Sequence, residues 1–223
     1  MIAWTIVNQH VEAFITFVYP NQANAFIHQG SVIRDTTNGS LDPLLAKALC
    51  TVAARFVTDG NGHREGGEHV TVWANEVKRG LMDGSNRFST TTVSIALLIN
   101  LHELNSGNYG SSWLLVSMAS RIAYALNLNV ESRLPWPEAE LRRRLMWAVF
   151  QADSHPSAGV REYITCPLDS VQLRLPSNDR HFTLSIPIES SIFNTHEYMP
   201  VVGCDGIASR SIWLMALRSR ILL

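Results

Sequence analysis

The chain has 223 residues, of which 46% are hydrophobic, and its 18 lysines and arginines nearly balance 19 aspartates and glutamates to leave a net charge of −1. A chain of this length buries roughly 70% of its unfolded surface, so it can form a substantial core without disulfides or metals. Proteins that bind nucleic acid through its phosphates typically have a strong excess of basic residues, and this chain has none.

The three cysteines lie far apart, at Cys50, Cys166 and Cys204. This spacing provides neither the paired ligands of a zinc site nor a disulfide framework, so we expect a reducing compartment inside the cell. The sequence opens without a basic and apolar leader, and its most apolar run, SIALLINL at residues 94–101, is far shorter than a membrane span. We therefore expect a soluble protein that makes no contact with a membrane.

Helical signals dominate the first half of the chain. Asp42 is placed to cap a helix that has Pro43 at its first position, and apolar residues then recur at helical spacing to Phe56. Apolar residues at three- and four-residue spacing predict a second helix over residues 65–81. A stretch rich in turn-forming residues follows and separates this helix from the next.

Two stretches in the middle of the chain are apolar on nearly every face. They are STTTVSIALLINLHEL at residues 89–104 and SSWLLVSMASRIAYALNL at residues 111–128, and a glycine-containing turn separates them. Helices that are hydrophobic all round are buried, so both should lie at the centre of the fold. We expect residues 94–104 and 113–126 to be its most protected parts.

The segment PWPEAELRRRLMWAVFQAD, residues 135–153, predicts a helix with Pro137 at its first position and acidic residues in its first turn. Its inward stripe is formed by Leu141, Leu145, Ala148 and Ala152. Prolines and turn clusters then predict an irregular excursion, before helical periodicity returns through Ile212. The prediction is an all-α fold: a compact multi-helix domain over residues 1–223, with an irregular excursion after the arginine-rich helix.

Three consecutive basic side chains raise the question of nucleic-acid binding: Arg142, Arg143 and Arg144. Glu138 and Glu140 stand four residues before the first and third of them, an order that favours ion pairs of about 0.3 kcal/mol each at an exposed site. The middle arginine stands four residues before Trp147 and could lie over the indole ring. The helix does not continue its basic face, so we expect a solvated helix edge rather than a polyanion contact.

Side chains capable of acid–base chemistry are few and scattered. The run LHEL at residues 101–104 begins like a zinc-protease helix, but Ser106 stands where the second histidine would be needed. Adjacent residues on a helix point in different directions, so a hydrogen-bonded core histidine is the preferred interpretation there. Asp153 and His155 are interpreted as groups that satisfy a helix C-terminus. For an enzyme, the candidate catalytic side chains would be His102, Glu103, Asp153 and His155.

Four stretches occur in an order that is typical of one family: VEAFITFVYPNQANAFIHQGSVIRD, LLAKALCTVAARFV, LLINLHELNSGNYGSSWLLVSMASRIAYALNL and ELRRRLMWAVFQAD. They resemble the fungal-specific transcription factor domain, the helical middle homology region of zinc binuclear cluster regulators. The resemblance runs from Val11 to Pro176 and resumes at Ile212. The arginine helix, a Gly-x-Arg and the passage PLDSVQLRLP are its most specific elements. The positions that carry this signature are Arg142, Arg143, Arg144, Trp147, Asp153, Gly159 and Arg161.

The resemblance implies a single regulatory domain of a fungal transcription factor that modulates transcription through intramolecular, partner or effector contacts. It implies protein partners or a homodimer, a small-molecule effector and a nuclear location, with the cytoplasm as the location otherwise. The family's zinc belongs to a six-cysteine DNA-binding cluster that this sequence does not contain, so no cofactor is expected and DNA would be contacted only through a missing domain. We also expect the C-terminal part of the family domain to be truncated.

One departure and one alternative remain. Ser154 follows Asp153, whereas family members often have a basic residue there, which puts an ion pair of the family in question. The alternative function is a free-standing, shortened homologue that has been recruited as a small-molecule-binding protein or an enzyme in a biosynthetic gene cluster of secondary metabolism.

Overall fold

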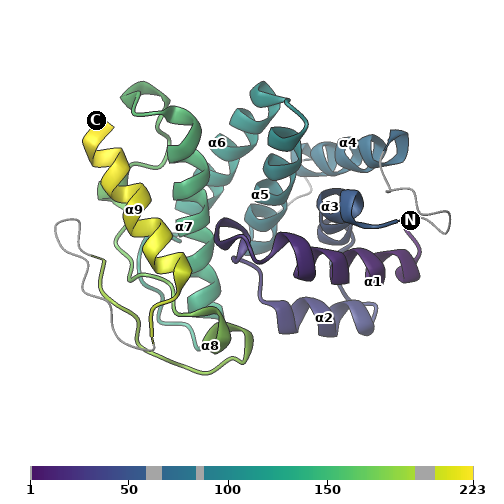
Figure 1. The fold of residues 1–223 in the computed structure, drawn as a ribbon, viewed down its shortest axis with the longest axis horizontal. Helices are drawn as coiled ribbons and strands as arrows, with labels where there is room; N and C mark the ends of the chain where they lie inside the picture. Colours follow the sequence, from purple (N-terminus) through teal and green to yellow (C-terminus); the bar gives the residue numbers. More distant parts are fainter. Residues whose placement is uncertain (1, 59–66, 84–87, 194–203, 223) are drawn as a thin grey trace.

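The computed structural model describes residues 2–58, 67–83, 88–193 and 204–222. Within these ranges the chain forms nine α-helices and no β-strand, which confirms the predicted all-α class (Figure 1). The helices are α1 (Trp4–Ala13), α2 (Gln29–Thr37), α3 (Pro43–Ala53), α4 (Glu68–Met82), α5 (Thr90–Asn105), α6 (Tyr109–Ala125), α7 (Glu138–Ser157), α8 (Asp179–Thr183) and α9 (Ile207–Leu222). Short helical turns are η1 (Phe14–Val18), η2 (Gln22–Asn24), η3 (Ala54–Phe56), η4 (Arg161–Tyr163) and η5 (Leu168–Ser170).

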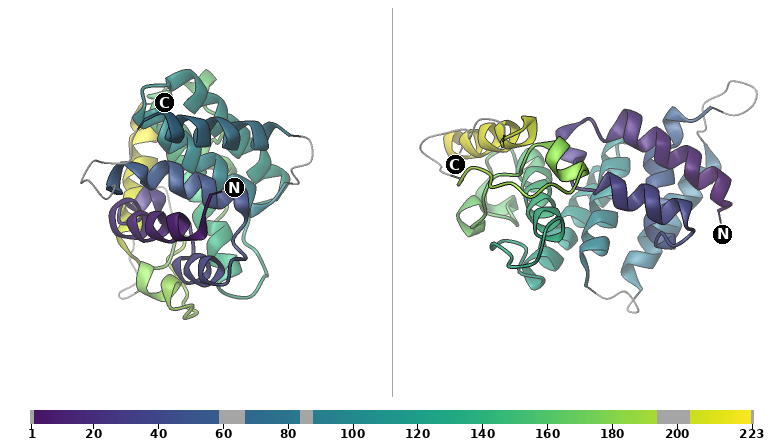
Figure 2. Two further views of the ribbon diagram at one scale, coloured as in Figure 1. Left: turned by 90° about the vertical axis from the view of Figure 1, so that its right-hand side faces the viewer. Right: turned by 90° about the horizontal axis from the view of Figure 1, so that it is seen from below.

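The helices are arranged around α5. Helices α1 to α4 gather at one end of the long axis and α6, α7 and α9 at the other, with α5 between them (Figure 1). Figure 2 shows from below that α9 lies at the far end from α1 and α2. The closest helix pairs are α5 with α6, α3 with α5, and α6 with α7. One cluster of buried apolar side chains reaches from α1 to α9. None of the described helices could cross a membrane.

Helix α3 begins as its sequence predicts. The Asp42 carboxylate accepts hydrogen bonds from the backbone N–H groups of Leu44 and Leu45, both at 2.9 Å. Pro43 occupies the first turn, where its missing N–H costs nothing. This N-cap fixes the start of a helix that packs against α1, α4 and α5, and so holds the N-terminal half of the fold together.

Helix α5 has the protected environment predicted for it, but α6 has it only in part. Residues 92–100 of α5 are all buried, because α3, α4, α6 and α7 surround the helix. On α6, the side chains of Trp113 and Leu114 are 46% and 61% exposed. The prediction that residues 113–126 are among the most protected parts of the fold is therefore correct for only one face of α6, since the helix packs mainly on α5 and α7 and leaves its other face open.

Helix α7 is more buried than an amphipathic helix. It begins at Glu138, one residue after the predicted start at Pro137, and every residue from Arg143 to Gln151 is buried. The predicted single inward stripe is therefore too narrow. Helices α5 and α6 cover one side of α7, and α9 lies along it on the other (Figure 1). The excursion after α7 is mostly irregular, as predicted. Its described residues form the short helix α8, the turns η4 and η5 and isolated bridges such as Arg174 to Ile192.

Candidate functional site

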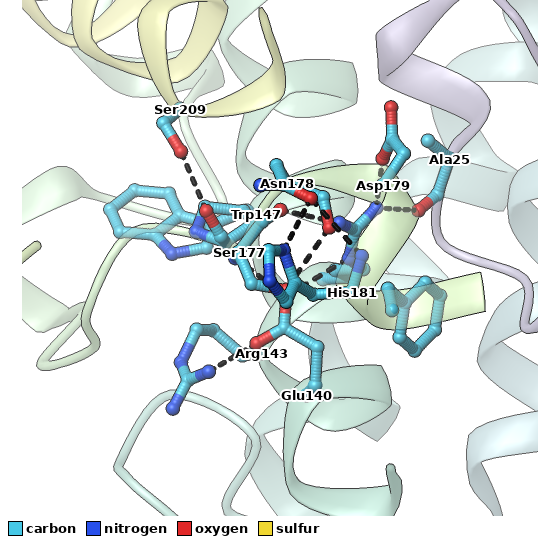
Figure 3. Close-up of polar contacts among 12 residues, drawn as sticks. Ala25, Glu140, Arg143, Trp147, Ser177, Asn178, Asp179, His181 and Ser209 are labelled. Atoms are coloured by element: carbon cyan, nitrogen blue, oxygen red, sulfur yellow. Dashed lines mark hydrogen bonds and ion pairs between the residues drawn. The ribbon is translucent and has the colours of Figure 1, made fainter. Parts of the chain in front are cut away.

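A buried carboxylate organises the first turn of α7. Glu140 has none of its surface exposed. Its Oε1 atom accepts hydrogen bonds from Arg144 Nε at 3.0 Å, from the Ser177 backbone N–H at 2.8 Å and from the Ser177 hydroxyl at 3.0 Å, and its Oε2 atom accepts one from Arg143 (Figure 3). A buried charge is tolerated only when it is paired and hydrogen-bonded, and Glu140 meets both conditions.

Arg144 joins three separate segments of the chain to α7. Its Nη1 atom donates to the Ala25 carbonyl at 2.8 Å and to Asp179 Oδ1 at 2.7 Å, and its Nη2 atom donates to the Ser177 carbonyl at 2.6 Å. The guanidinium also lies over the Phe182 ring, with 4.3 Å between its Cζ atom and the ring centroid. With 3% of its surface exposed, Arg144 connects the N-terminal turn to α8 and to the part of the excursion directly before α8.

Arg143 fixes the connection between α6 and α7. Its Nε and Nη2 atoms donate to the two carboxylate oxygens of Glu131, at 3.1 and 2.8 Å, in the two-pronged geometry that suits a guanidinium and a carboxylate. Glu131 also accepts from the Arg174 backbone N–H at 2.6 Å. Burial opposes ionisation of Glu131, but the hydrogen bonds from Arg143 and Arg174 outweigh it and lower the pKa of that carboxyl.

The prediction that the three consecutive arginines form a solvated helix edge is therefore wrong. Arg143 and Arg144 are buried, and the half-buried Arg142 donates to the Leu126 carbonyl at 2.6 Å. Of the predicted contacts, only the Glu140–Arg144 ion pair forms as expected among the described residues. The indole of Trp147 packs against Phe150 and Phe193, and its Nε1 atom donates to the Arg174 carbonyl at 2.8 Å. Helical spacing identified neighbours along α7 but could not show that the excursion folds back over the helix.

The excursion is held to α7 by its polar groups and to α9 by a further hydrogen bond. The Ser209 hydroxyl of α9 donates to the Pro176 carbonyl at 2.6 Å (Figure 3). In α8, the Asn178 side chain caps the helix by accepting from the His181 backbone N–H at 3.0 Å. We call Arg143, Arg144 and their partners Glu131, Glu140, Ser177 and Asp179 the arginine network. It lies where the N-terminal turn, α7, α8 and α9 meet.

Asp153 anchors the start of the excursion. Its Oδ2 atom accepts from the backbone N–H groups of Thr165 at 2.9 Å and Cys166 at 2.8 Å, and its Oδ1 atom accepts from the Thr165 hydroxyl at 2.6 Å. Only 3% of Asp153 is exposed, so all of these bonds lie inside the protein. The prediction that Asp153 satisfies the end of its own helix is wrong in detail, because its partners Thr165 and Cys166 lie in the excursion, eight and nine residues after the last residue of α7.

The other signature residues near the end of α7 have different environments. Gly159 has a φ angle of 87°, and a Cβ atom there would lie 2.5 Å from the Cβ atom of Leu222. Glycine is therefore needed both for the backbone conformation and for the close approach of α9. Arg161 and His155 are exposed. Among the described residues, no hydrogen bond or ion pair joins His155 to Asp153.

His102 and Glu103 line a cavity of about 450 Å³ together with Lys78. Lys78 Nζ donates to Glu103 Oε1 at 3.1 Å, and within the described residues no hydrogen bond joins Glu103 to His102. Burial opposes ionisation of Glu103, but the hydrogen bond and charge of Lys78 outweigh it and lower its pKa. Burial lowers the pKa of His102. Glu103 is thus the partner of a lysine rather than half of an acid–base pair.

The cysteines are thiols that form no disulfide. Burial raises the pKa of the Cys166 thiol to about 12, so this group stays protonated at neutral pH. Across the part of the chain that the structure describes, histidine, cysteine, aspartate and glutamate side chains do not gather in a group that could hold a metal ion. The described site therefore consists of internal ion pairs and hydrogen bonds.

Three partners of the arginines escaped the sequence reasoning: Glu131, Ser177 and Asp179. They are 12, 33 and 35 residues away from the arginine that each contacts, so no helical periodicity points to them. One signal was present. The passage PLDSVQLRLP ends at Pro176, directly before Ser177, and its resemblance to a family motif marked this part of the excursion as special.

Comparison with known proteins gives the family. The model of the fungal specific transcription factor domain matches residues 11–200. A Zn(2)-C6 fungal-type transcription factor, FTF1c, from Fusarium oxysporum f. sp. lycopersici is 27% identical over 90% of this chain and 23% of its own length. FTF2 from the same fungus is 29% identical over 76% of this chain and 17% of its own length. An uncharacterized transcriptional regulatory protein of Schizosaccharomyces pombe is 27% identical over 78% of this chain and 19% of its own length.

The chain spans less than a quarter of the length of each of these relatives. No solved structure matches it. The family match begins at residue 11, where the resemblance begins in the sequence, and it includes the arginine helix, the Gly-x-Arg and the passage that ends at Pro176. The chain belongs to the fungal specific transcription factor domain family.

Proposed function

We propose that this chain is the regulatory domain of a fungal transcription factor and that it modulates transcription through intramolecular, partner or effector contacts without reading DNA itself. The observation that carries the proposal is the family match over residues 11–200. The relatives are transcription factors and transcriptional regulators several times longer than this chain, which supports the role of one part within a larger protein. A nuclear location follows from that role.

The burial of the basic run on α7 supports the proposal that the domain does not read DNA itself. DNA binding through phosphates needs Lys and Arg side chains that can reach the backbone. Arg143 and Arg144 instead make ion pairs with Glu131, Glu140 and Asp179 inside the protein. The net charge of −1 adds no compensating basic excess. The most basic stretch of the sequence therefore serves the fold.

The outer face of α9 supports a contact with a protein. Its apolar side chains Ile207, Leu214 and Ile221 are 67%, 60% and 74% exposed, and they are spaced seven residues apart, so they lie along one side of the helix. An apolar line of this kind is typical of a helix that packs against another helix. The partner is a second copy of the chain or another protein segment.

The enzyme alternative has no observation in its favour. Its candidate side chains are distributed over separate places, with Glu103 bonded to Lys78, Asp153 bonded to Thr165 and His155 exposed. We also propose that the chain carries no zinc of its own. Elemental analysis of the purified protein should find much less than one zinc per chain, and two per chain would contradict this.

A transcription assay tests the proposal. The chain is joined to an unrelated DNA-binding domain, and reporter output is compared with that of the DNA-binding domain alone. The native chain and Arg121→Met, which changes an exposed arginine of α6, should alter output equally. Arg144→Met, which removes a buried arginine, should weaken the effect because it destabilises the domain. If the native fusion is expressed and folded but behaves like the bare DNA-binding domain, the proposal fails.

A further inference from the structure

A cavity of about 300 Å³ lies where α9 meets the N-terminal half of the fold. Its walls come from the turn at residues 21–26 and from α5, α6, α7 and α9. This volume is at the lower end of the range for small-molecule sites, so it suits a compound with one or two rings rather than a nucleotide. The cavity is separate from the arginine network.

The cavity wall is apolar and carries no permanent charge. Phe26, Leu97 and Ala148 form buried parts of it, and Met215 of α9 lies on the side toward solvent. The only titratable side chain in the lining is His155, which is exposed. An ion would lose its hydration there without gaining an opposite charge, so the cavity favours an uncharged occupant.

Three buried carboxamides interrupt this apolar wall, Asn24, Asn100 and Gln151, and a fourth, Asn21, is exposed. The three buried residues are 8%, 8% and 7% exposed. One end of each amide is used within the protein. Asn24 Nδ2 donates to the Val18 carbonyl at 3.1 Å, Asn100 Oδ1 accepts from the Ser112 hydroxyl at 2.6 Å, and Gln151 Nε2 lies 3.4 Å from the Ser211 hydroxyl.

All three residues line the cavity, and the other end of each amide is not used within the protein. Across the described residues, no protein group hydrogen-bonds to Asn24 Oδ1, Asn100 Nδ2 or Gln151 Oε1. None of these three atoms is among the described side-chain atoms that are fully buried without a partner, so water can reach them. Ligand sites commonly place a few such polar groups in an apolar wall to orient the bound molecule. The wall therefore offers one donor, from Asn100, and two acceptors, from Asn24 and Gln151.

We infer that this cavity is the effector site of the domain and that it binds a small, uncharged, mainly apolar molecule that carries both a hydrogen-bond donor and an acceptor, such as a primary amide. The word effector rests on the regulatory function proposed above. A molecule bound here contacts α5, α7, α9 and the N-terminal turn together, so binding stabilises the packing of α9 against the rest of the domain.

A titration with benzamide tests the inference. Its ring matches the apolar wall, its carbonyl can accept from Asn100, and its amino group can donate to Gln151. The purified, isotopically labelled chain should show saturable changes in the side-chain amide signals of Asn100 and Gln151 on addition of benzamide. Benzoate has the same shape but a charge and no donor, and it should cause no such changes. Absence of saturable changes with benzamide, or equal binding of benzoate, would overturn the inference.

Substitutions locate the binding. Gln151→Met keeps the side-chain volume but removes the acceptor, and it should weaken benzamide binding by about tenfold. Gln9→Met is the matched control, because Gln9 is an exposed glutamine of α1, and it should bind as the native chain does. Ala152→Phe fills the cavity from α7 and should abolish binding, which keeps the test decisive if Gln151→Met does not fold. Native-like affinity in a folded Ala152→Phe variant would place the compound elsewhere and end the proposal.

The binding test and the transcription test distinguish a failure of the cavity proposal from a failure of the proposed role in transcription. Benzamide binding to the purified chain requires no DNA and no reporter, so it succeeds or fails independently of the proposed role in transcription. Binding with the predicted pattern, combined with a reporter that the folded fusion does not change, would leave the cavity as a ligand site and remove its role as an effector site.

Discussion

Arg144 illustrates what a buried charge requires of its surroundings. Its guanidinium donates to Glu140, Asp179 and two backbone carbonyls, and it stacks on Phe182. Removing one member of such a pair leaves the other charge buried without compensation, which typically costs about 3–5 kcal/mol. The same substitution at an exposed arginine lowers the free energy of unfolding only slightly, because water solvates that charge in the folded and in the unfolded chain.

Arg144→Met should therefore lower the free energy of unfolding by about 3–5 kcal/mol, because the buried Glu140 loses one of its two arginine partners and the Ala25 and Ser177 carbonyls lose their donor. Arg121→Met, on the exposed face of α6, should change it by less than about 0.5 kcal/mol. Urea denaturation followed by circular dichroism measures both values. Equal, small effects of the two substitutions would mean that Arg144 is solvated after all.

The lowered pKa of Glu131 predicts that the free energy of unfolding depends on pH. Its pKa in the folded protein lies below the ordinary value of 4.5, so its contribution is fully present above pH 4.5 and is lost as the pH falls through the folded pKa. Glu131→Gln should reduce stability at neutral pH and should lose less further stability than the native chain below pH 4.5. Denaturation at a series of pH values checks this, and parallel curves for the two proteins would refute it.

At the scale of the helices, local sequence signals were sufficient where local interactions decide the structure. The Asp42 cap and the apolar faces of α5 predicted those helices correctly. The environment of α7 could not be predicted in the same way. Its partners Glu131 and Ser177 lie in segments whose sequence has no helical or strand periodicity. Likewise, the exposure of Trp113 depends on which helices cover α6, and the composition of α6 does not determine that.

The core of α7 should be far more sensitive than the open face of α6. Phe150 is 1% exposed and packs against Trp147 with 5.7 Å between the ring centroids, so Phe150→Ala should destabilise by about 3–5 kcal/mol. Leu114→Ala, at a residue of α6 that is 61% exposed, should cost less than about 1 kcal/mol. Thermal or urea unfolding measures both, and a small effect at Phe150 would contradict the burial of α7.

The connection between α7 and the excursion depends on Asp153. In Asp153→Asn, one acceptor oxygen becomes a donor that faces the N–H groups of Thr165 and Cys166 or the Thr165 hydroxyl. Hydrogen exchange at the amides of Thr165 and Cys166 should accelerate at least tenfold, at a cost of about 1–3 kcal/mol in stability. Asp169→Asn, at an exposed aspartate of the same segment, is the control and should leave both amides protected. Unchanged protection in Asp153→Asn would rule out this anchoring role.

At the scale of the whole molecule, the arginine network and the cavity follow one another along the same face of α7, because Arg144 stands four and seven residues before Ala148 and Gln151. They are built from different kinds of side chain. The network joins the N-terminal turn, α7, α8 and the excursion through charged groups. The cavity lies beside α9 and is lined by neutral groups. A basic run that looks like a nucleic-acid contact in the sequence thus stabilises the fold from inside, and the surfaces that we propose for regulation are the apolar line on α9 and the cavity beside it.

Whether the basic run of α7 serves the fold or nucleic acid is tested most directly by titrating the purified chain into labelled duplex DNA and following fluorescence anisotropy at several salt concentrations. We predict only weak association that disappears at physiological salt and does not depend on the DNA sequence, because Arg143 and Arg144 are held by carboxylates inside the protein. Nanomolar, sequence-specific binding at physiological salt by the folded chain would contradict this account.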